Sequence, residues 1–318
     1  MNKTLIFAVG AVALMACYVG ISFYVKRYVK SVADFWVMGR QAKWWMFTGT
    51  LCATYVSMWT FLAGVGLAWG WGPLSPMLFY TSSLTFGWII ATVLLGLRLR
   101  RMQCNSVTEF FEKRFGTNPG YFYTGLSIAL AGSLFFYLLL QIQGTGIILS
   151  TIFSLPMSVS ILIIVVILII SLDAAGMWSV VASDTFSCLI FIIVAIFVLP
   201  ITISSVGGLE TGIAAVNAQN LWSATGASKL NMTYFLGYAL SWLAIVGGSP
   251  HIINRSLVVD TPKSVLKGTF VGYILTIILT VVRFHSGSLL VAKIAPNAMP
   301  VDSSAPVAAL YSWPLWLG

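Results

Sequence analysis

Charged side chains are scarce in this sequence, because Asp, Glu, Lys and Arg together make up 8% of its 318 residues. A typical soluble domain has about 25%. Hydrophobic residues account for 59% of the chain, and the mean hydropathy is +0.95. This balance excludes a soluble globular protein and predicts a polytopic membrane protein. The apolar residues form long runs instead of the alternating ten-residue segments of a transmembrane β-barrel, so we expect an all-α fold.

Histidine and cysteine, two common metal ligands, are also few. His251 and His285 are the two histidines, and the sequence has no HExxH motif. The four cysteines are Cys17, Cys52, Cys104 and Cys188. They show no CxxC spacing, which argues against a zinc site or a disulfide framework, and we interpret them as packing residues. Because the acids lie mostly in loops, we expect neither an enzyme nor a cofactor.

Positive charge is more abundant, with a net charge of +9, but it is confined to alternate loops. Five Lys or Arg residues fall in 26–43, five in 98–119 and three in 254–267. The loops on the other side hold Lys3, Lys229 and Lys293. This is a positive-inside distribution, so the charge reflects topology and not a nucleic-acid-binding surface. It predicts a multi-pass protein of a cell membrane, which we expect to be a bacterial inner membrane, with the N-terminus outside.

The apolar runs predict the membrane spans. At about 20 residues per span, they lie at 4–25, 45–69, 75–97, 121–149, 158–173, 178–203, 232–253 and 268–292. Residues 106–116 are expected to form a short amphipathic helix at the cytoplasmic surface, since Ser106 followed by Glu109 is a capping-box pattern. Another apolar segment starts at Tyr311.

The run from Thr48 to Gly72 has the length of a span but is rich in Gly, Ser and Thr. Each glycine weakens a helix by about 1 kcal/mol relative to alanine, so the composition predicts an interrupted helix. Irregular backbone at membrane depth is tolerated only where it is buried in protein or lines a cavity. Two explanations are open: close helix packing through small residues, or a binding site for a substrate or an ion.

A second interruption is expected in the span 232–253, at Gly247 to Pro250. The two interrupted helices are five spans apart and have opposite polarity. This arrangement is typical of inverted-repeat secondary transporters, which bind their substrate near the middle of the membrane. The second break therefore favours binding over packing for the first.

Several motifs resemble those of the sodium:solute symporters, the family that includes proline, pantothenate, sialic acid and glucose carriers. They are Ser31-x-x-Asp34-Phe35-Trp36-Val37-Met38-Gly39-Arg40, Ala53-x-x-x-Ser57-x-Trp59, Gly176 through Ser183-Asp184-Thr185, Ile203 to Gly208, and Gly248-Ser249-Pro250-His251. They occur in the family's order over almost the whole chain.

The resemblance implies a leucine-transporter-like, inverted-repeat fold within a single transmembrane domain, 1–318. Residues 1–44 would form an extra first span and a basic cytoplasmic loop. Residues 45–204 would then form a complete first five-helix repeat, and 232–318 an incomplete second repeat.

The resemblance also implies a sodium site. The carbonyls of Ala53 and Val56 would face the ion, with Ser57 nearby and Asp184 on the inward release path. The third helix of the second repeat, which would complete the site, is expected to be cut short at Gly318. Asp184 is alternatively an ordinary acid near a helix N-terminus, and the Ser57 hydroxyl alternatively bonds to its own helix.

A substrate site is expected at Thr60, Gly64, Gln141, Trp242 and Ser249. Trp242 matches a substrate-cavity aromatic of the proline-type carriers, although Trp is also common in cores and at membrane interfaces. Tyr55 stands where those carriers have an aspartate, and Val246 where they have a tyrosine, which argues against proline as the substrate.

Arg283 is unusual because it lies inside the span 268–292, where a positive charge costs about 3 kcal/mol or more. Snorkelling of the side chain toward the outer interface is the preferred interpretation. Pairing with a substrate carboxylate is the alternative.

The sequence therefore predicts a sodium-driven symporter of a small organic solute, such as an amino acid or a carboxylate, working by alternating access. Its partners would be sodium, the solute and the lipid bilayer, with no nucleic acid. Proton coupling is an alternative because sodium rests on the resemblance. A truncated relic or a membrane sensor module is another, because the chain ends within an apolar segment.

Overall fold

The computed structural model describes residues 3–57, 63–74, 77, 80, 81, 83–116, 121–222 and 232–292. Within these ranges the chain is helical, and the pairing of Ala42 with Val259 is an isolated bridge. The all-α prediction is confirmed for this part of the chain. Thr60 and the segment 293–318 lie outside it.

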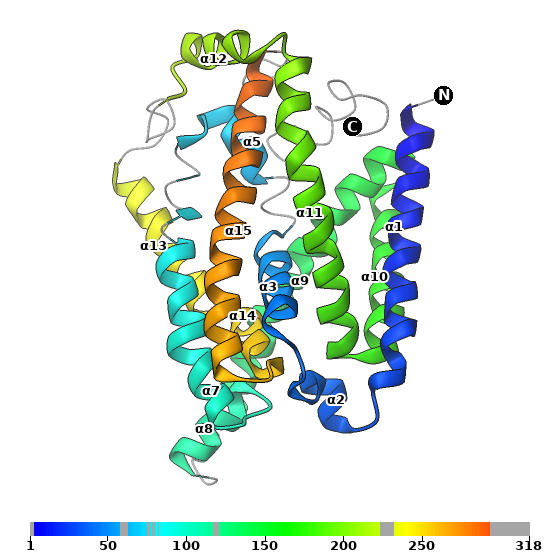
Figure 1. Cartoon of the computed structure of the whole chain (residues 1–318), viewed down its shortest axis with the longest axis vertical. Coiled ribbons are helices and arrows are strands. Elements are labelled where there is room, and N and C mark those ends of the chain that lie inside the picture. Colours follow the sequence, from blue (N-terminus) through cyan, green and yellow to red (C-terminus); the bar gives the residue numbers. More distant parts are fainter. Residues whose placement is uncertain are drawn as a thin grey trace.

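Five helices of the described residues are long and apolar enough to cross a membrane. They are α1 (Lys3–Val25), α9 (Phe122–Phe153), α10 (Met157–Ala175), α11 (Met177–Ser205) and α15 (Pro262–Leu289). Each covers one of the predicted spans, and α1, α11 and α15 run along the long axis of the molecule in Figure 1. The prediction of a multi-pass membrane protein is confirmed.

The span predicted at 45–69 is split into two helices. α3 (Trp44–Tyr55) ends at Val56, whose backbone leaves the helical region with φ −77° and ψ 67°. α5 (Ala63–Trp71) follows after residues 58–62, which are not among those described. The interruption expected between Thr48 and Gly72 is therefore confirmed, and it starts at Val56.

The span predicted at 232–253 is interrupted as well. α13 (Met232–Gly248) and α14 (Pro250–Ile253) are separated by Ser249, which is extended with φ −68° and ψ 117°. Pro250 occupies the first turn of α14, where it has no N–H to donate back to α13. A short 3₁₀ segment, η5 (Asn254–Val258), continues the chain.

Between α5 and α9 the chain forms two π-helical segments, η3 (Ser83–Gly87) and η4 (Ile89–Gly96), and then α7 (Leu97–Arg101). Gly87 brings this span against α13, because a Cβ atom at Gly87 would lie 2.8 Å from the Cβ of Val246. The span predicted at 75–97 thus packs directly on the second interrupted helix.

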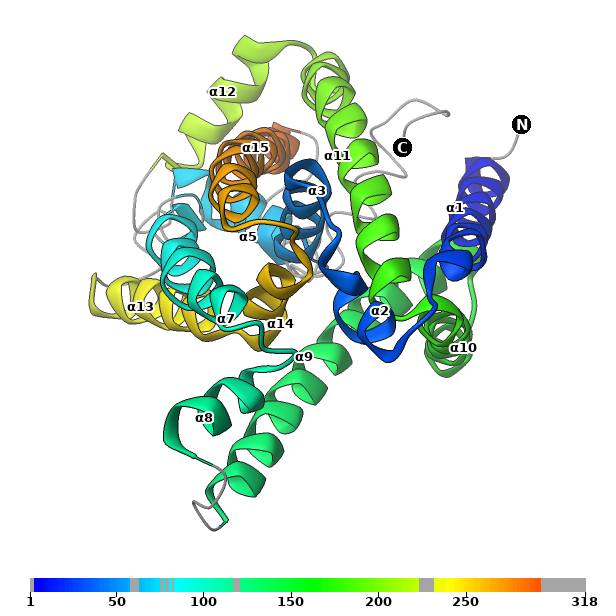
Figure 2. The same ribbon diagram turned by 60° about the horizontal axis from the view of Figure 1, so that its bottom comes forward.

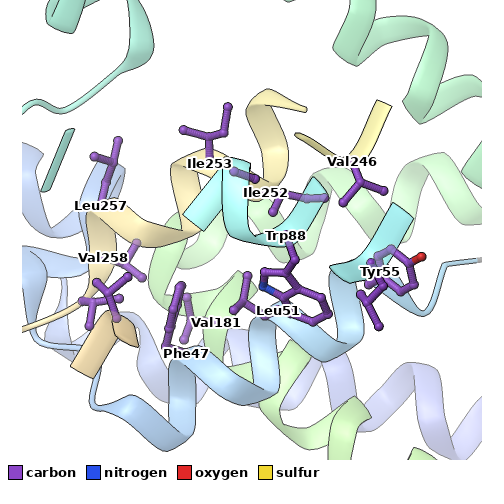
Figure 3. Packing of buried hydrophobic residues seen from close by; sticks show 14 of the residues in the cluster. Phe47, Leu51, Tyr55, Trp88, Val181, Val246, Ile252, Ile253, Leu257 and Val258 are labelled. Atoms are coloured by element: carbon purple, nitrogen blue, oxygen red, sulfur yellow. The ribbon is translucent and has the colours of Figure 1, made fainter. Parts of the chain in front are cut away.

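The largest hydrophobic core lies where the two interrupted helices meet (Figure 3). We name α13, α14 and η5 together the second interrupted segment. The labelled members of the core are Phe47, Leu51 and Tyr55 from α3, Trp88, Val181 from α11, and Val246, Ile252, Ile253, Leu257 and Val258 from the second interrupted segment. Between membrane helices such side chains stabilise the fold through close van der Waals packing, because lipid is as apolar as the core. The core therefore holds the two breaks beside each other.

Glycines let α3 approach its neighbours closely. A Cβ atom at Gly268 of α15 would lie 2.7 Å from the Phe47 ring, and one at Gly49 would lie 2.9 Å from the Cα of Thr185 in α11. The Thr48 hydroxyl donates to the Gly268 carbonyl at 3.2 Å. Figure 2 shows α3 between α11 and α15. Some of the small residues of 48–72 are therefore needed for close helix packing.

The three basic loops meet at one end of the molecule. The Lys43 ammonium pairs with Asp260 at 2.9 Å. Arg100 donates from Nε to the Val259 carbonyl at 2.5 Å and from Nη2 to the Asp260 carbonyl at 2.6 Å. Loops that the charge pattern assigned to the same side therefore contact one another.

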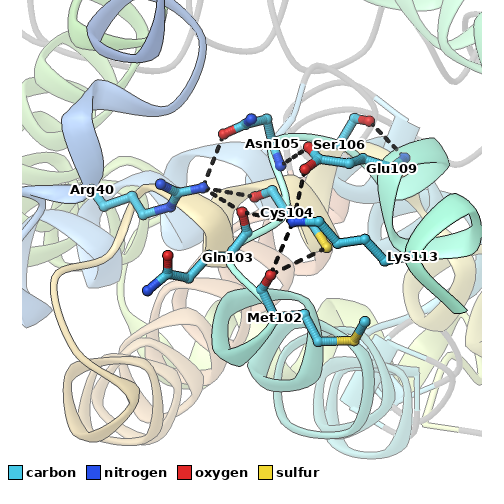
Figure 4. A network of polar contacts seen from close by, with 8 residues as sticks. All are labelled: Arg40, Met102, Gln103, Cys104, Asn105, Ser106, Glu109 and Lys113. Carbon is cyan, nitrogen blue, oxygen red and sulfur yellow. Dashed lines mark hydrogen bonds and ion pairs between the residues drawn. The ribbon is translucent and has the colours of Figure 1, made fainter.

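Arg40 joins the first two of these loops (Figure 4). It follows α2 (Val32–Val37), and its Nη2 donates to the carbonyls of Gln103 at 2.7 Å and Cys104 at 3.3 Å and to Oδ1 of Asn105 at 2.9 Å. These bonds attach the segment before span two to the segment after α7.

The helix predicted at 106–116 is present as α8 (Val107–Phe115). The Ser106 hydroxyl accepts from the Glu109 N–H at 3.0 Å, as expected for a cap. The Glu109 carboxylate, however, accepts from the Asn105 N–H at 2.6 Å, one residue before the position that a standard capping box uses. A second short helix, α12 (Leu209–Ala218), lies at the opposite end of the molecule (Figure 1).

Candidate functional site

Two cavities lie beside the helix breaks. The first, which we name the aromatic cavity, has a volume of 350 Å³ and is lined by Thr54, Tyr55, Ser57, Tyr80, Tyr137, Leu140, Gln141, Ser241, Trp242, Ile245, Val246, Ser249, His251 and Ile252. The second, the ion-pair cavity, has a volume of 290 Å³ and is lined by Ala53, Thr54, Val56, Ser57, Tyr137, Gln141, Thr145, Asp184, His251 and Arg255. Ser57 at the first break lines both cavities, and the second break contributes Ser249 to the aromatic cavity and His251, directly after it, to both.

Aromatic rings form one wall of the aromatic cavity. Tyr80 stacks on Trp242 of α13 with ring centroids 5.4 Å apart, and Tyr55 at the end of α3 meets Tyr80 edge-on at 5.9 Å. Gln141 of α9 adds an amide, and Val246 adds apolar surface. A mostly apolar lining with a few hydrogen-bonding groups is typical of a site for a small organic molecule.

The ion-pair cavity is named for Asp184 of α11 and Arg255 of η5. Arg255 Nη2 lies 3.2 Å from Asp184 Oδ2, and the Thr50 hydroxyl donates to the same oxygen at 2.6 Å. Both charged side chains are largely buried, with 13% of Arg255 and 22% of Asp184 exposed. The pair joins the first interrupted helix, α11 and the second interrupted segment.

The end of α3 makes this cavity favourable for a cation. Ala53 and Val56 lie in the last turn and at the cap of α3, where the final carbonyls of a helix have no partner within the helix. The helix dipole also places partial negative charge there. One of these carbonyls, that of Thr54, accepts from the Tyr137 hydroxyl at 3.4 Å. Carbonyls of an interrupted helix are the groups that coordinate sodium in inverted-repeat transporters.

Tyr137 and His251 lie between the two cavities. Their rings stack with centroids 4.2 Å apart and an interplanar angle of 17°, and both side chains line both cavities. Thr54, Ser57 and Gln141 are also shared. A solute and an ion in the two cavities would therefore contact common residues.

The structure brings together seven of the nine residues predicted for the site. Ala53, Val56, Ser57 and Asp184 surround the ion-pair cavity, whereas Gln141, Trp242 and Ser249 line the aromatic cavity. The Ser249 hydroxyl donates back to the Ile245 carbonyl. Gly64 is buried in α5 and does not line either cavity, and Thr60 lies outside the described residues. Binding at all nine positions stays a prediction.

Other lining residues were not expected from the sequence. Tyr80, Tyr137 and His251 had no assigned role, and Arg255 had been counted only as a basic-loop charge. Arg255 lies five residues after the second break. This short distance along the chain could have predicted that Arg255 lies near the break. Its pairing with Asp184 is visible only in the fold.

The interpretation of Arg283 as a snorkelling residue was wrong. The side chain is buried, with 8% of the residue exposed, and its Nε donates to the Leu279 carbonyl at 3.0 Å. This burial means that the side chain does not extend to the membrane interface, and Phe284, Ser286 and Gly287 beside it are buried too. This stretch of α15 packs inside the molecule.

Comparison with known proteins agrees with this architecture. The model of the sodium:solute symporter family matches residues 35–307. A sodium/pantothenate symporter of Haemophilus influenzae is 23% identical over an alignment of 292 residues, and the match covers 89% of this chain and 59% of the relative. The chain thus spans about six tenths of that relative's length.

The fold is also similar to that of a solved transporter. A chain described as the substrate-bound outward-open state of a Na+-coupled sialic acid symporter superposes with a TM-score of 0.81 and 15% sequence identity, covering 98% of this chain and 68% of that chain. This match supports the leucine-transporter-like fold. Because the family model covers most of the sequence, the protein belongs to the sodium:solute symporter family.

Proposed function

We propose that this chain carries the transport site of a secondary transporter that couples sodium to the movement of a small organic solute by alternating access. The observation that carries the proposal is that residues at or directly after both helix breaks, Ser57 and His251, line both of the adjoining cavities. An interrupted helix can bend at its break, so a site shared by two breaks can close on one side and open on the other.

Sodium would bind in the ion-pair cavity. Ala53 and Val56 would supply carbonyl oxygens, Ser57 a hydroxyl and Asp184 a carboxylate. Family membership and the sodium-coupled relatives support sodium as the coupling ion. The negative end of the α3 dipole favours any cation, sodium or a proton. The identity of the coupling ion therefore has to be tested.

The solute would bind in the aromatic cavity. Gln141 and Ser249 would offer polar contacts, and Trp242 would contribute its ring, while Thr60 and Gly64 stay predicted members of this site. Pantothenate and sialic acid, the solutes of two relatives, are the first compounds to try. An apolar, aromatic lining favours a solute with an apolar part.

The test is uptake by the purified full chain in proteoliposomes, with labelled pantothenate or sialic acid, under an inward sodium gradient or a potassium gradient. We expect sodium-dependent uptake, and a loss of at least tenfold in Trp242→Ala because its ring forms a cavity wall (about 1.4 kcal/mol of binding). Trp45→Ala is the control, since Trp45 is half exposed at the start of α3.

Two results would contradict the proposal. Flux of every transported solute that does not depend on sodium would overturn the coupling. Sodium-dependent stabilisation of the protein without flux of any solute would favour a sensor module of the same fold.

We also propose that the basic end of the molecule faces the cytoplasm, which leaves the N-terminus outside. The contacts among the three basic loops support this orientation through the positive-inside rule. A bacterial inner membrane is the proposed location because the matched relative is bacterial.

A further inference from the structure

Asp184 already has a cationic partner in this structure. Its Oδ2 atom accepts from Thr50 at 2.6 Å and pairs with Arg255 at 3.2 Å. Within the described residues no donor contacts Oδ1 of the same carboxylate. Asp184 also lines the cavity beside Ala53 and Val56. A cation entering that cavity would therefore meet a carboxylate that an arginine occupies in part.

Arg255 makes weaker polar contacts than Arg40 and Arg100, the two arginines that connect the basic loops. Arg40 donates to three oxygen acceptors, and Arg100 donates to two carbonyls at 2.5 and 2.6 Å. Among the described residues, the polar contacts of Arg255 are the ion pair with Asp184 and a weak contact from Nη1 to the Met177 sulfur at 3.6 Å. Its buried Nε has no hydrogen-bond partner among the described residues. The guanidinium can thus leave Asp184 while losing one strong interaction.

We infer that Arg255 is an internal cation that competes with sodium for Asp184. It neutralises the carboxylate when the cavity holds no ion and moves away when sodium binds. The inference rests on the proposed function, because it requires sodium in the ion-pair cavity. Its physical basis is that two cations at one carboxylate repel each other, and between largely buried side chains this repulsion is weakly screened.

The competition would couple the ion to the fold. Asp184 belongs to α11, whereas Arg255 belongs to η5, directly after α14. While the pair is closed, it ties the second interrupted segment to α11. Sodium binding would separate Arg255 from Asp184. By thermodynamic reciprocity, the cavity would bind sodium more tightly when the ion pair is already broken.

The first test measures sodium affinity of the full chain without any solute, by sodium-dependent thermal stabilisation with potassium keeping the ionic strength constant. The buffer is held at about pH 8.5 for every variant, because alkaline pH favours the charged form of a carboxyl. We expect Arg255→Gln to bind sodium about tenfold more tightly, a change of ~1.4 kcal/mol. Asp184→Asn should lose most of the sodium response.

Two variants serve as controls. Arg255→Lys retains a competing cation and should keep the wild-type affinity within about twofold. Arg101→Gln removes an exposed positive charge from the same end and should leave the affinity unchanged. Sodium affinity in Arg255→Gln that equals or falls below the wild-type value would overturn the inference.

A second test uses the wild-type chain and avoids any folding defect. Hydrogen exchange is compared in sodium and in potassium. Peptides covering 250–258 should exchange faster in sodium, because the ion pair between Arg255 and Asp184 of α11 is broken there. Peptides of α7, where Arg100 is anchored, should not change. Equal exchange of 250–258 in both salts, although sodium stabilises the protein, would overturn this inference alone. A wild-type chain without any sodium response would overturn the sodium coupling proposed above as well.

Discussion

Gly176 joins α10 to α11 with a backbone conformation that favours glycine. Its φ is +52° and its ψ −129°, and a Cβ atom there would lie 2.5 Å from the Phe35 carbonyl oxygen and 2.8 Å from the Phe35 ring. Both the strain and the contact oppose a side chain at this position. The residue thus lets the turn between two spans pack against α2.

We therefore expect Gly176→Ala to lower the thermal stability of the detergent-solubilised protein. The unfavourable backbone conformation alone costs about 1–3 kcal/mol, and Phe35 has to move in addition. Gly132→Ala in α9 is the matched control, because nothing lies within 4 Å of its Cβ position and alanine favours a helix by about 1 kcal/mol. Equal melting temperatures for the two variants would contradict the argument.

Asp260 is an acid whose surroundings favour its charged form. Burial raises the pKa of its carboxyl, but hydrogen bonds from Ser264, Lys43 and the Thr261 N–H outweigh that effect and lower the pKa below its ordinary value of 3.8. A lowered pKa in the folded state stabilises the fold above the ordinary value. The stabilisation is lost as the pH falls through the lowered value.

Asp260→Asn is accordingly expected to lower the melting temperature at neutral pH and to make less and less difference as the pH falls below the ordinary value of 3.8. The loss should be small, about 0.2–1 kcal/mol, because Lys43 is mostly exposed and water screens the pair. Glu210→Gln, which removes an exposed acid at the opposite end of the molecule, is the control. A stability difference that persists unchanged to pH 3 would rule out the ionised pair as its cause.

At the scale of elements, α8 depends on its cap more than the spans do. The helix has nine residues, and none of them is buried, whereas helices of this length are marginal without packing. We expect Ser106→Ala to cost about 1 kcal/mol of local stability and to speed hydrogen exchange in 107–115. Ser133→Ala, inside the long helix α9, should leave that segment unchanged. Equal exchange of 107–115 in wild type and Ser106→Ala would show that the cap is dispensable.

The interrupted helices show why element type was easier to predict than element contacts. Gly, Ser, Thr and Pro weaken a helix through local backbone effects, so the breaks near Val56 and Ser249 were visible in the sequence. The partners of each glycine were not visible. Gly49 and Gly268 pack against neighbouring helices, and only the arrangement of α3, α11 and α15 shows this.

At the scale of the whole molecule, the orientation in the membrane can be tested by cysteine labelling in cells. On a Cys17→Ser background, a cysteine placed at Glu210 of α12 should react with a membrane-impermeant maleimide from outside. A cysteine at Lys263, at the start of α15, should react only after permeabilisation, since the basic loops are expected inside. The reverse pattern would invert the proposed topology.

The helical class, the membrane-length apolar runs, the basic end and the two breaks follow from the amino-acid sequence alone. These features depend on the composition of one segment at a time, because a span needs about 20 apolar residues and freed backbone groups need partners wherever they occur. The family motifs then placed Ala53, Ser57 and Asp184 in a common site, and the fold gathers them around one cavity.

Which side chains face one another depends on how the helices pack, and this could not be predicted from the sequence. Arg255 and Asp184 are far apart in the sequence but form an ion pair, Tyr137 and His251 stack between the two cavities, and Arg283 is buried in the packed interior. Hydropathy cannot distinguish these outcomes, because it records how apolar a helix is and not which of its faces meets another helix. That choice is made by the packing of α3, α11 and α15 against the second interrupted segment.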